Sequence, residues 1–313
     1  MVVDGGAVDW PALVVHGGAG PYTRLTTDPG LAGRLSGALD AALDAGWAVL
    51  EAGGSALDAA VAAVRFMEDD GAFNAGRGSV PTTGGSVEMD ACVMDDTGRA
   101  GAVTCLSGHS AVAAARAVWA EPPGEAQPGG RTVLLAGAGA EAFAAGAGVS
   151  ELVPIHRAAR PGVADPAPLS PEGTVGAVAV TADGRFAGAT STGGRAGQPP
   201  GRVGDSPIPG AGVWAEPGCA VSATGAGEAF ILAGFSRLVA TGRSRGLTLD
   251  ESIRRALAEV ARYGGDGGGI ALARDRTWVG AFDTRAMARG VRHRGGKRVT
   301  VGDPPGPRSG GRL

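Results

Sequence analysis

Hydrophobic and polar positions follow two different periods along the chain. Apolar residues recur every three or four positions over 31–50, which predicts an amphipathic helix that follows Asp28 and Pro29 and ends at Gly53. Ser55, with Asp58 three residues later, predicts the start of a second helix that runs to about Met67 and is followed by an acidic turn at 68–71. Further helices are predicted at 110–120, from 141, after 227 and at 249–263.

Short apolar runs between glycine, proline and polar residues predict β-strands. A hairpin is predicted from strands 175–181 and 185–190, and the last hairpin of the chain from strands 269–273 and 277–281. The other predicted strands are 12–16, 86–94, 100–106, 132–136 and 220–223. Helices and hairpin-connected strands in this mixture predict an α+β fold, or layered sheets with helices outside.

A proline-rich stretch interrupts the pattern at 158–172. It reads AARPGVADPAPLSPE, has no apolar periodicity and predicts a flexible linker. Segment 191–212 is predicted to be a glycine- and proline-rich loop, and the tail after 302 is predicted to fray.

Composition excludes several classes of protein. Hydrophobic residues make up 44% of the 313 positions, which is too many for a disordered chain. Net charge is −3 with no basic block, so no nucleic-acid partner is expected. No long uncharged apolar run exists, so no membrane partner is expected.

The cysteines and the N-terminal residues favour a cytoplasmic location. Cys92, Cys105 and Cys219 have no CxxC spacing and are odd in number, which is typical of free thiols in a reducing compartment. The first residues have neither a basic nor an apolar segment of a signal peptide. Four scattered histidines disfavour a zinc site.

Two glycine-rich turns imitate a dinucleotide-binding loop. Gly137 and Gly139 follow the predicted strand 132–136, and Gly225 and Gly227 follow 220–223. Neither turn has the acidic residue expected about 20 residues later, and chance matches are common in a chain with 57 glycines. A nucleotide-binding protein that uses the Gly137 or the Gly225 loop remains an alternative.

The dipeptide Gly173-Thr174 lies where the linker meets a strand, which suggests a processing site. The Thr174 hydroxyl could attack the Gly173 carbonyl to form an ester, which water would cleave to leave Thr174 as a new N-terminus. The freed amine, with an ordinary pKa near ~8, could then act as the base for its own hydroxyl. By itself the dipeptide is weak evidence, because Gly-Thr often simply begins a strand.

Several ordered motifs surround this dipeptide. They are HGGAG from His16, FNAGRGS from Phe73, EMDACVMD from Glu88, GTVGAV from Gly173, TSTGG from Thr190, GRVGDSP from Gly201, TGAGE from Thr224 and GGDGGG from Gly264. Together they closely resemble plant-type L-asparaginases and isoaspartyl peptidases, over roughly residues 12–290. That family consists of N-terminal-nucleophile hydrolases with a four-layer αββα sandwich.

The resemblance implies an α subunit of residues 1–173, with 158–173 as linker, and a β subunit of residues 174–313. Both would belong to one folded domain and would assemble as a homodimer of α/β pairs. The implied reaction is hydrolysis of L-asparagine to L-aspartate and ammonia, together with cleavage of β-aspartyl dipeptides.

Catalytic roles follow from the resemblance. Thr174 is the nucleophile freed by cleavage after Gly173, and Thr192 tunes its amine and hydroxyl. Thr224 and Gly225 form the oxyanion hole, and Asn74 faces the nucleophile. The structural alternatives are a helix N-cap at Thr224 and a simple turn at Asn74.

The resemblance also implies a small-molecule substrate site. Arg202 clasps the substrate α-carboxylate and Asp205 accepts from its α-ammonium, with Thr224, Gly225 and Gly227 beside them. A planar guanidinium suits bidentate contact with a carboxylate. The alternative for Arg202 and Asp205 is a surface ion pair.

No organic cofactor is implied. The resemblance also implies a structural sodium ion bound by the backbone carbonyls of Met67, Glu68, Phe73 and Ala75, ligands that leave almost no side-chain signature.

Two rivals share the expected fold. Glycosylasparaginase usually has Asn where Gly193 stands and is usually exported, so Gly193 and the missing signal peptide argue against it. A homologue that never matures and acts as a scaffold is the other. Asp283 stands where related sequences often have Asn, and its role stays open.

Overall fold

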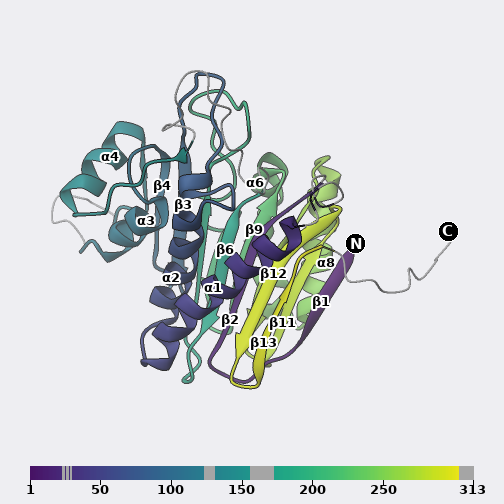
Figure 1. Cartoon of the computed structure of the whole chain (residues 1–313). Coiled ribbons are helices and arrows are strands. Elements are labelled where there is room, and N and C mark those ends of the chain that lie inside the picture. Colours follow the sequence, from purple (N-terminus) through teal and green to yellow (C-terminus); the bar gives the residue numbers. More distant parts are fainter. Residues whose placement is uncertain (23–24, 26–27, 29, 123–130, 156–172, 303–313) are drawn as a thin grey trace.

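Two β-sheets form the centre of the molecule (Figure 1). The computed structural model describes residues 1–22, 25, 28, 30–122, 131–155 and 173–302. The larger sheet has the strand order β13-β12-β2-β6-β7-β3-β4-β5 and the smaller one β1-β11-β10-β9-β8. Neighbouring strands pair antiparallel except β4 and β5, which are parallel.

The strands come from both halves of the chain. Those of the larger sheet are β2 (Ala12–Gly20), β3 (Met89–Asp95), β4 (Ala100–Leu106), β5 (Leu134–Ala136), β6 (Val175–Val180), β7 (Phe186–Thr192), β12 (Ala286–His293) and β13 (Gly296–Thr300). Those of the smaller sheet are β1 (Val2–Ala7), β8 (Val213–Glu216), β9 (Cys219–Gly225), β10 (Gly267–Ala273) and β11 (Thr277–Phe282).

The helices pack on the sheets in separate groups. They are α1 (Leu31–Glu51), α2 (Ala56–Asp70), α3 (Ala111–Ala120), α4 (Gly137–Gly146), α6 (Gly227–Ala233), α7 (Phe235–Ser244) and α8 (Leu249–Arg262). Apolar residues of α1, α2 and α3 share one core with the larger sheet, and those of α7 and α8 share another with the smaller sheet.

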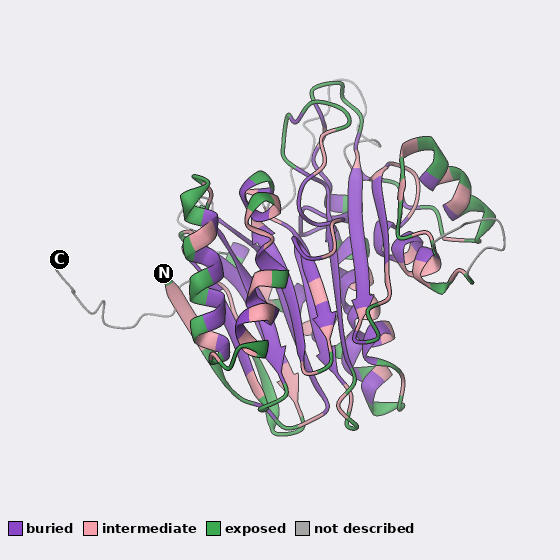
Figure 2. Ribbon diagram, turned by 180° about the vertical axis from the view of Figure 1, so that it is seen from behind, coloured by how far each residue is buried: buried purple, intermediate pink, exposed green. Residues whose placement is uncertain are grey.

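A third apolar cluster joins the two sheets. Val178 of β6 and Met287 of β12 meet Ile270 of β10 and Trp278 of β11 there. Figure 2 shows central strands that are buried almost throughout, whereas the helices carry exposed residues on their outer sides. This arrangement explains why every residue of β2 and β6 is buried without alternation, since both faces of each strand are covered.

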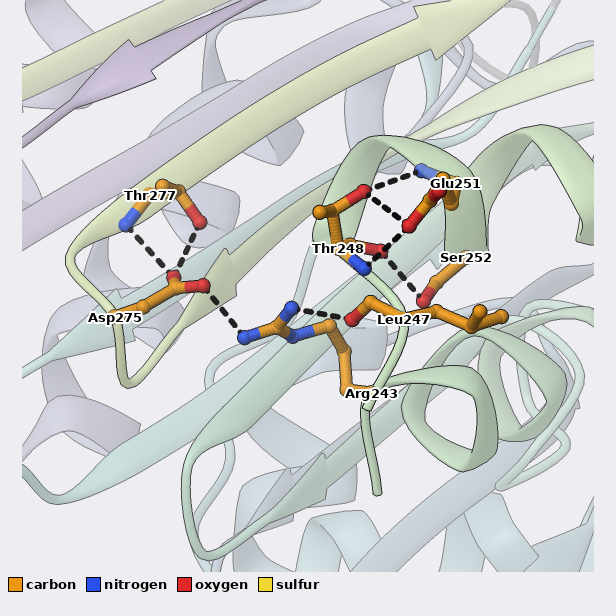
Figure 3. A network of polar contacts seen from close by, with 7 residues as sticks. All are labelled: Arg243, Leu247, Thr248, Glu251, Ser252, Asp275 and Thr277. Atoms are coloured by element: carbon orange, nitrogen blue, oxygen red, sulfur yellow. Dashed lines mark hydrogen bonds and ion pairs between the residues drawn. The ribbon is translucent and has the colours of Figure 1, made fainter. Parts of the chain in front are cut away.

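The start of α8 is fixed by a polar network (Figure 3). The Thr248 hydroxyl accepts from the Glu251 backbone N–H, and the Glu251 carboxylate accepts from the Thr248 backbone N–H, which is a capping box. Arg243 at the end of α7 donates to the Leu247 carbonyl and pairs with Asp275 in the β10–β11 turn. The network therefore ties α7 and α8 to the hairpin beneath them.

The main helices and the hairpin β6–β7 confirm the sequence prediction of mixed α and β structure. Ser55 caps α2 as predicted, with its side chain accepting from the Asp58 N–H. The predicted acidic turn is wrong, because α2 continues to Asp70 and ends at Gly71, which adopts a φ of +80°. Of the predicted linker 158–173, Gly173 alone lies within the described residues, and the tail after 302 lies outside them.

Other differences concern strands. The strand predicted at 12–16 continues through the glycine cluster to Gly20. The hairpin β10–β11 is not the last, since β12 and β13 follow it, and β1 and β8 were not predicted. The helix predicted after 227 is two helices, separated at Gly234, whose φ is +59°.

Candidate active site

Thr174 lies directly before β6 and is buried, with 5% of its surface exposed. Its backbone nitrogen donates to Thr224 Oγ1 at 3.1 Å, and its hydroxyl lies 2.9 Å from the Ser206 hydroxyl. Thr224 is on β9 of the smaller sheet, whereas Ser206 lies in the loop between β7 and β8. The two sheets and one loop therefore converge on a single threonine.

Gly173 is held in a conformation that favours glycine. Its φ is +91°, and a Cβ at this position would lie 2.6 Å from Gly18 Cα and 3.1 Å from the Ala19 nitrogen. The same Ala19 N–H donates to Thr224 Oγ1 at 3.1 Å. Strand β2 therefore packs closely against the Gly173-Thr174 bond and shares a hydrogen-bond acceptor with it.

Thr192 ends the neighbouring strand. Val175 pairs with Ser191 in the β6–β7 register, so one further step places Thr192 opposite Thr174. The Thr192 hydroxyl accepts from the Gly194 N–H at 3.1 Å. Opposite residues of an antiparallel pair project from the same face of a sheet, so the two threonines lie on one face.

Asp90 continues this row, because it pairs with Thr192 across β3 and β7. Its carboxylate accepts from the Thr104 hydroxyl and the Cys105 N–H. Burial raises the pKa of Asp90 to about 6, against the lowering effect of these bonds and of one from the Gly204 N–H. Asp90 therefore connects the row of threonines to the loop that contains Arg202.

Arg202 and Asp205 converge on the first turn of α6. A Cβ at Gly227 would lie 2.9 Å from Arg202 Nη2 and 3.1 Å from Asp205 Oδ1. Arg202 Nε donates to Glu228 at 2.9 Å, and Nη1 lies 3.4 Å from the Gln198 side-chain oxygen. Because residue 227 is glycine, the space between the Arg202 guanidinium and the Asp205 carboxylate stays open.

The carboxylate of Asp205 is buried and incompletely paired. Among the described residues, its Oδ2 atom has no hydrogen-bond partner. Burial raises its pKa to about 7; its own backbone N–H and Arg202 oppose this effect, whereas Asp90 and Glu228 add to it. A buried carboxylate with an unused oxygen is suited to accept from a cationic ligand such as an ammonium group.

Asn74 supports the turn after β7. Its side-chain nitrogen donates to the Gly194 carbonyl at 2.7 Å, and its side-chain oxygen accepts from the Val80 N–H. Its own backbone carbonyl accepts from the Gly193 N–H. A Cβ at Gly193 would lie 2.6 Å from the Asn74 side-chain oxygen, so this turn needs glycine. The structure places Asn74 under the Gly193-Gly194 turn.

The segment predicted to bind sodium bends back on itself. A Cβ at Gly76 would lie 2.4 Å from the Glu68 carbonyl oxygen, and one at Gly78 would lie 2.1 Å from the Phe73 carbonyl oxygen. The Phe73 and Ala75 carbonyls accept from backbone N–H groups within this segment. Met67 and Glu68 are in the last turns of α2.

His16 and Asp283 have structural partners. His16 is fully buried, its Nε2 lies 2.8 Å from the Ser222 hydroxyl, and burial lowers its pKa to about 3 although a bond to the Thr174 backbone opposes this. Asp283 accepts from the Gly267 N–H at 2.8 Å, and burial raises its pKa.

Sequence reasoning missed Ser206. It directly follows Asp205 in the GRVGDSP motif, and its hydroxyl is the one that contacts the Thr174 hydroxyl. The GRVGDSP motif could have pointed to Ser206. Its contact with Thr174 has no local pattern, because the two residues are 32 positions apart. In the described part of the chain, no helix is long and apolar enough to cross a membrane, and no cluster of His, Cys, Asp and Glu is arranged to hold a metal ion.

Comparison with known proteins gives a consistent result. The asparaginase family profile matches residues 9–162 and 156–301. An isoaspartyl peptidase of Escherichia coli is 40% identical over 301 residues, covering 88% of this chain and 91% of the relative. A plant-type L-asparaginase of Pyrobaculum calidifontis is 42% identical over 89% of this chain and 95% of its own. A human isoaspartyl peptidase/L-asparaginase is 36% identical over 88% of this chain and 91% of its own.

Proposed function

The chain belongs to the asparaginase family, and we propose that it is an amidohydrolase that acts on L-asparagine and on β-aspartyl dipeptides. The observation that carries this proposal is the position of Thr174, which follows a constrained Gly173 and contacts Thr224 and Ser206. Arg202 and Asp205 lie on the loop that supplies Ser206. A nucleophile and a receptor for an amino-acid head group are thus combined.

Maturation is the first reaction. The Thr174 hydroxyl adds to the Gly173 carbonyl carbon, the C–N bond breaks, and the nitrogen takes a proton to become an amine. Water then hydrolyses the ester and yields a carboxylate at Gly173 and a free hydroxyl at Thr174. The positive φ of Gly173 and its close approach to Gly18 support cleavage at this bond.

Substrate hydrolysis uses the same hydroxyl. The Thr174 amine removes its proton, the oxygen attacks the side-chain carbonyl carbon of the substrate, and ammonia or an amino acid leaves with a proton. Water hydrolyses the resulting β-aspartyl ester, and L-aspartate departs.

Thr224 is suited to stabilise the oxyanion. A hydroxyl has two acceptor lone pairs and one donor. Both acceptor positions of Thr224 are used, by the N–H groups of Thr174 and Ala19, so its own proton is left to donate. The Gly225 N–H is the second donor of the oxyanion hole, and each such donor typically lowers a barrier by about 3 kcal/mol.

The substrate head group lies between Arg202 and Asp205. Its α-carboxylate displaces Glu228 from the Arg202 guanidinium, and its α-ammonium donates to the unused Oδ2 of Asp205. Gly227 leaves the room for both contacts. Thr192 lies opposite Thr174 in the sheet and orients the nucleophile from there. Its hydroxyl is held by the Gly194 N–H, and Asn74 in turn supports the Gly193-Gly194 turn.

The two facing sheets with helices outside support assignment to the four-layer αββα sandwich of N-terminal-nucleophile hydrolases. After cleavage, residues 1–173 and 174–313 remain one folded unit, since β2 pairs with β6 and β12 and thereby joins the two pieces. Two such units form the dimer, which light scattering after gel filtration tests.

We propose a sodium ion at the segment 67–77. Oxygen atoms are the ligands that hard cations prefer, and each carbonyl that already accepts one N–H retains a second lone pair. The carbonyls of Met67, Glu68, Phe73 and Ala75 would hold the ion and stiffen the segment that carries Asn74. Replacing sodium by choline in the buffer should lower the melting temperature if the ion is bound.

The decisive activity experiment compares three substrates. We expect ammonia from L-asparagine and leucine from β-aspartyl-leucine, with far slower turnover of a glycosyl-asparagine. Thr174→Ala should lose both activities, whereas Thr181→Ala, at the other end of β6, should retain them. Comparable turnover of the glycosyl-asparagine would favour a glycosylasparaginase, and activity in Thr174→Ala would refute the proposal.

A further inference from the structure

A pocket of about 410 Å³ opens beside the Gly173-Thr174 bond. Gly173, Gly194, Gly225 and Ala226 form part of its wall, so the pocket adjoins the residue directly before the nucleophile and one residue of the predicted oxyanion hole. Its charged lining residues are Arg195 and Asp266. An amino-acid leaving group that departs from Thr174 needs space of this kind, whereas ammonia does not.

Arg195 has a backbone fixed by hydrogen bonds and an exposed, loosely paired side chain. Its N–H donates to the Gln198 side-chain oxygen at 2.9 Å, and its carbonyl accepts from the Gln198 N–H at 3.0 Å. Its side chain is 68% exposed, and its contact with Glu228 is long, at 3.8 Å. A ligand carboxylate could therefore displace the Glu228 carboxylate from the Arg195 guanidinium with little loss of free energy, because an exposed ion pair contributes about 0–1 kcal/mol.

Arg195 and Arg202 flank the same carboxylate. Glu228 contacts Arg202 through Oε1 at 2.9 Å and Arg195 through Oε2 at 3.8 Å, so a single carboxylate separates the two cations. A β-aspartyl dipeptide also carries two α-carboxylates, roughly 7 Å apart, about two extended residues of chain. Asparagine carries only one.

We propose that Arg195 binds the C-terminal carboxylate of the leaving residue and thereby makes the enzyme prefer β-aspartyl dipeptides with a free C-terminus. The inference rests on the proposed function, since it names the second half of the substrate of that site. Arg202 takes the aspartyl carboxylate, and Arg195 takes the leaving residue's carboxylate. Arg195 is a specificity residue and takes no part in bond breaking.

The test uses asparagine, β-aspartyl-leucine and β-aspartyl-leucine amide, in which the second carboxylate is neutral. In the wild type, we expect kcat/KM for the amide to be about tenfold below that for the free acid, which corresponds to about 1.4 kcal/mol. Arg195→Met should remove most of this difference by raising KM for the free acid, while Arg195→Lys should restore part of it. Arg262→Met, at an exposed arginine on α8, is the matched control and should preserve the difference.

Each outcome separates this inference from the proposed function. If the wild type hydrolyses asparagine but treats the free acid and the amide alike, the role of Arg195 is wrong and the amidohydrolase stands. The same holds if Arg195→Met slows the free acid and the amide equally. If asparagine is hydrolysed and β-aspartyl-leucine is not, the role of Arg195 is wrong and the proposed function holds for asparagine alone. If no substrate is hydrolysed, or Thr174→Ala remains active, the proposed function itself fails.

Discussion

The hydroxyl oxygen of Thr224, on β9, lies 3.1 Å from the backbone nitrogen of Thr174, at the start of β6. This contact crosses from one sheet to the other and joins residues that are 50 positions apart. It places a polar group at the nitrogen that cleavage would release. The rate of maturation and the rate of substrate hydrolysis should therefore both depend on Thr224.

Thr224→Val removes this hydroxyl and keeps the shape of the side chain. We expect kcat for asparagine to fall by about 100-fold or more, because an oxyanion donor is lost. Steady-state kinetics of the cleaved protein will measure this change in kcat. Thr224→Ser keeps the hydroxyl and should remain within about tenfold of wild type, so an equal loss in both variants would argue against the assigned role.

Ser206→Ala tests the contact between the Ser206 and Thr174 hydroxyls. Loss of one neutral hydrogen bond of about 1 kcal/mol should slow cleavage between Gly173 and Thr174 roughly fivefold, because the attacking oxygen is less well oriented. A time course of precursor disappearance on a denaturing gel measures this rate. Ser236→Ala removes a buried hydroxyl on α7 and should leave the rate unchanged.

Gly173→Ala tests the constrained bond itself. The added Cβ would lie 2.6 Å from Gly18 Cα at a φ of +91°, so the backbone at Gly173 must leave its present conformation. Cleavage should slow by about tenfold or more. Gly85→Ala is the matched control, since Gly85 has a φ of +77° with no atom within 4 Å of its Cβ position. If both variants mature as the wild type does, the constraint at Gly173 is irrelevant to cleavage.

Asp205 should give the pH profile of kcat/KM a limb on the acidic side. The proposed contact with the substrate ammonium needs the carboxylate form of Asp205. Burial raises the pKa of Asp205 to about 7, with Asp90 and Glu228 adding to this effect and Arg202 opposing it. kcat/KM for asparagine, which reports the free enzyme, should therefore fall as pH drops through 7. In the complex the substrate ammonium stabilises the carboxylate, so kcat should hold to lower pH. An unchanged limb in Asp205→Asn would show that another group titrates.

The raised pKa of Asp205 also makes the free energy of unfolding depend on pH. A carboxyl group whose pKa is raised on folding binds its proton more tightly in the folded state than in the unfolded state. The free energy of unfolding should therefore decrease as pH rises from about 4 to 7, and Asp205→Asn should flatten this dependence. Urea unfolding at several pH values measures the slope.

Amphipathic helices were the easiest part of the fold to predict. The apolar spacing over 31–50 corresponds to α1, because one face of a surface helix must be buried. Strand β12 was missed because its sequence places Arg289 in the core, where it is 1% exposed and pairs with Asp4 of β1. A buried charge that depends on a partner 285 positions away leaves no local pattern.

The candidate site was predictable only where one short motif contains its parts. Arg202 and Asp205 lie three positions apart, and the structure brings both to Gly227. The contact between Thr174 and Thr224 arises from the stacking of two sheets, and that between Thr174 and Ser206 from the path of the loop between β7 and β8. No local pattern of residues encodes either contact. The structure places Asn74 at the Gly194 carbonyl, a position that depends on how the loop after β7 folds over it.

Intact-mass analysis of the purified protein under denaturing conditions tests the central claim most directly. The account predicts two chains, residues 1–173 and 174–313, with threonine as the new N-terminus, and a single full-length chain for Thr174→Ala. A wild-type protein that stays full length and still hydrolyses asparagine would contradict the account, because Thr174 would then have no free amine to act as its base.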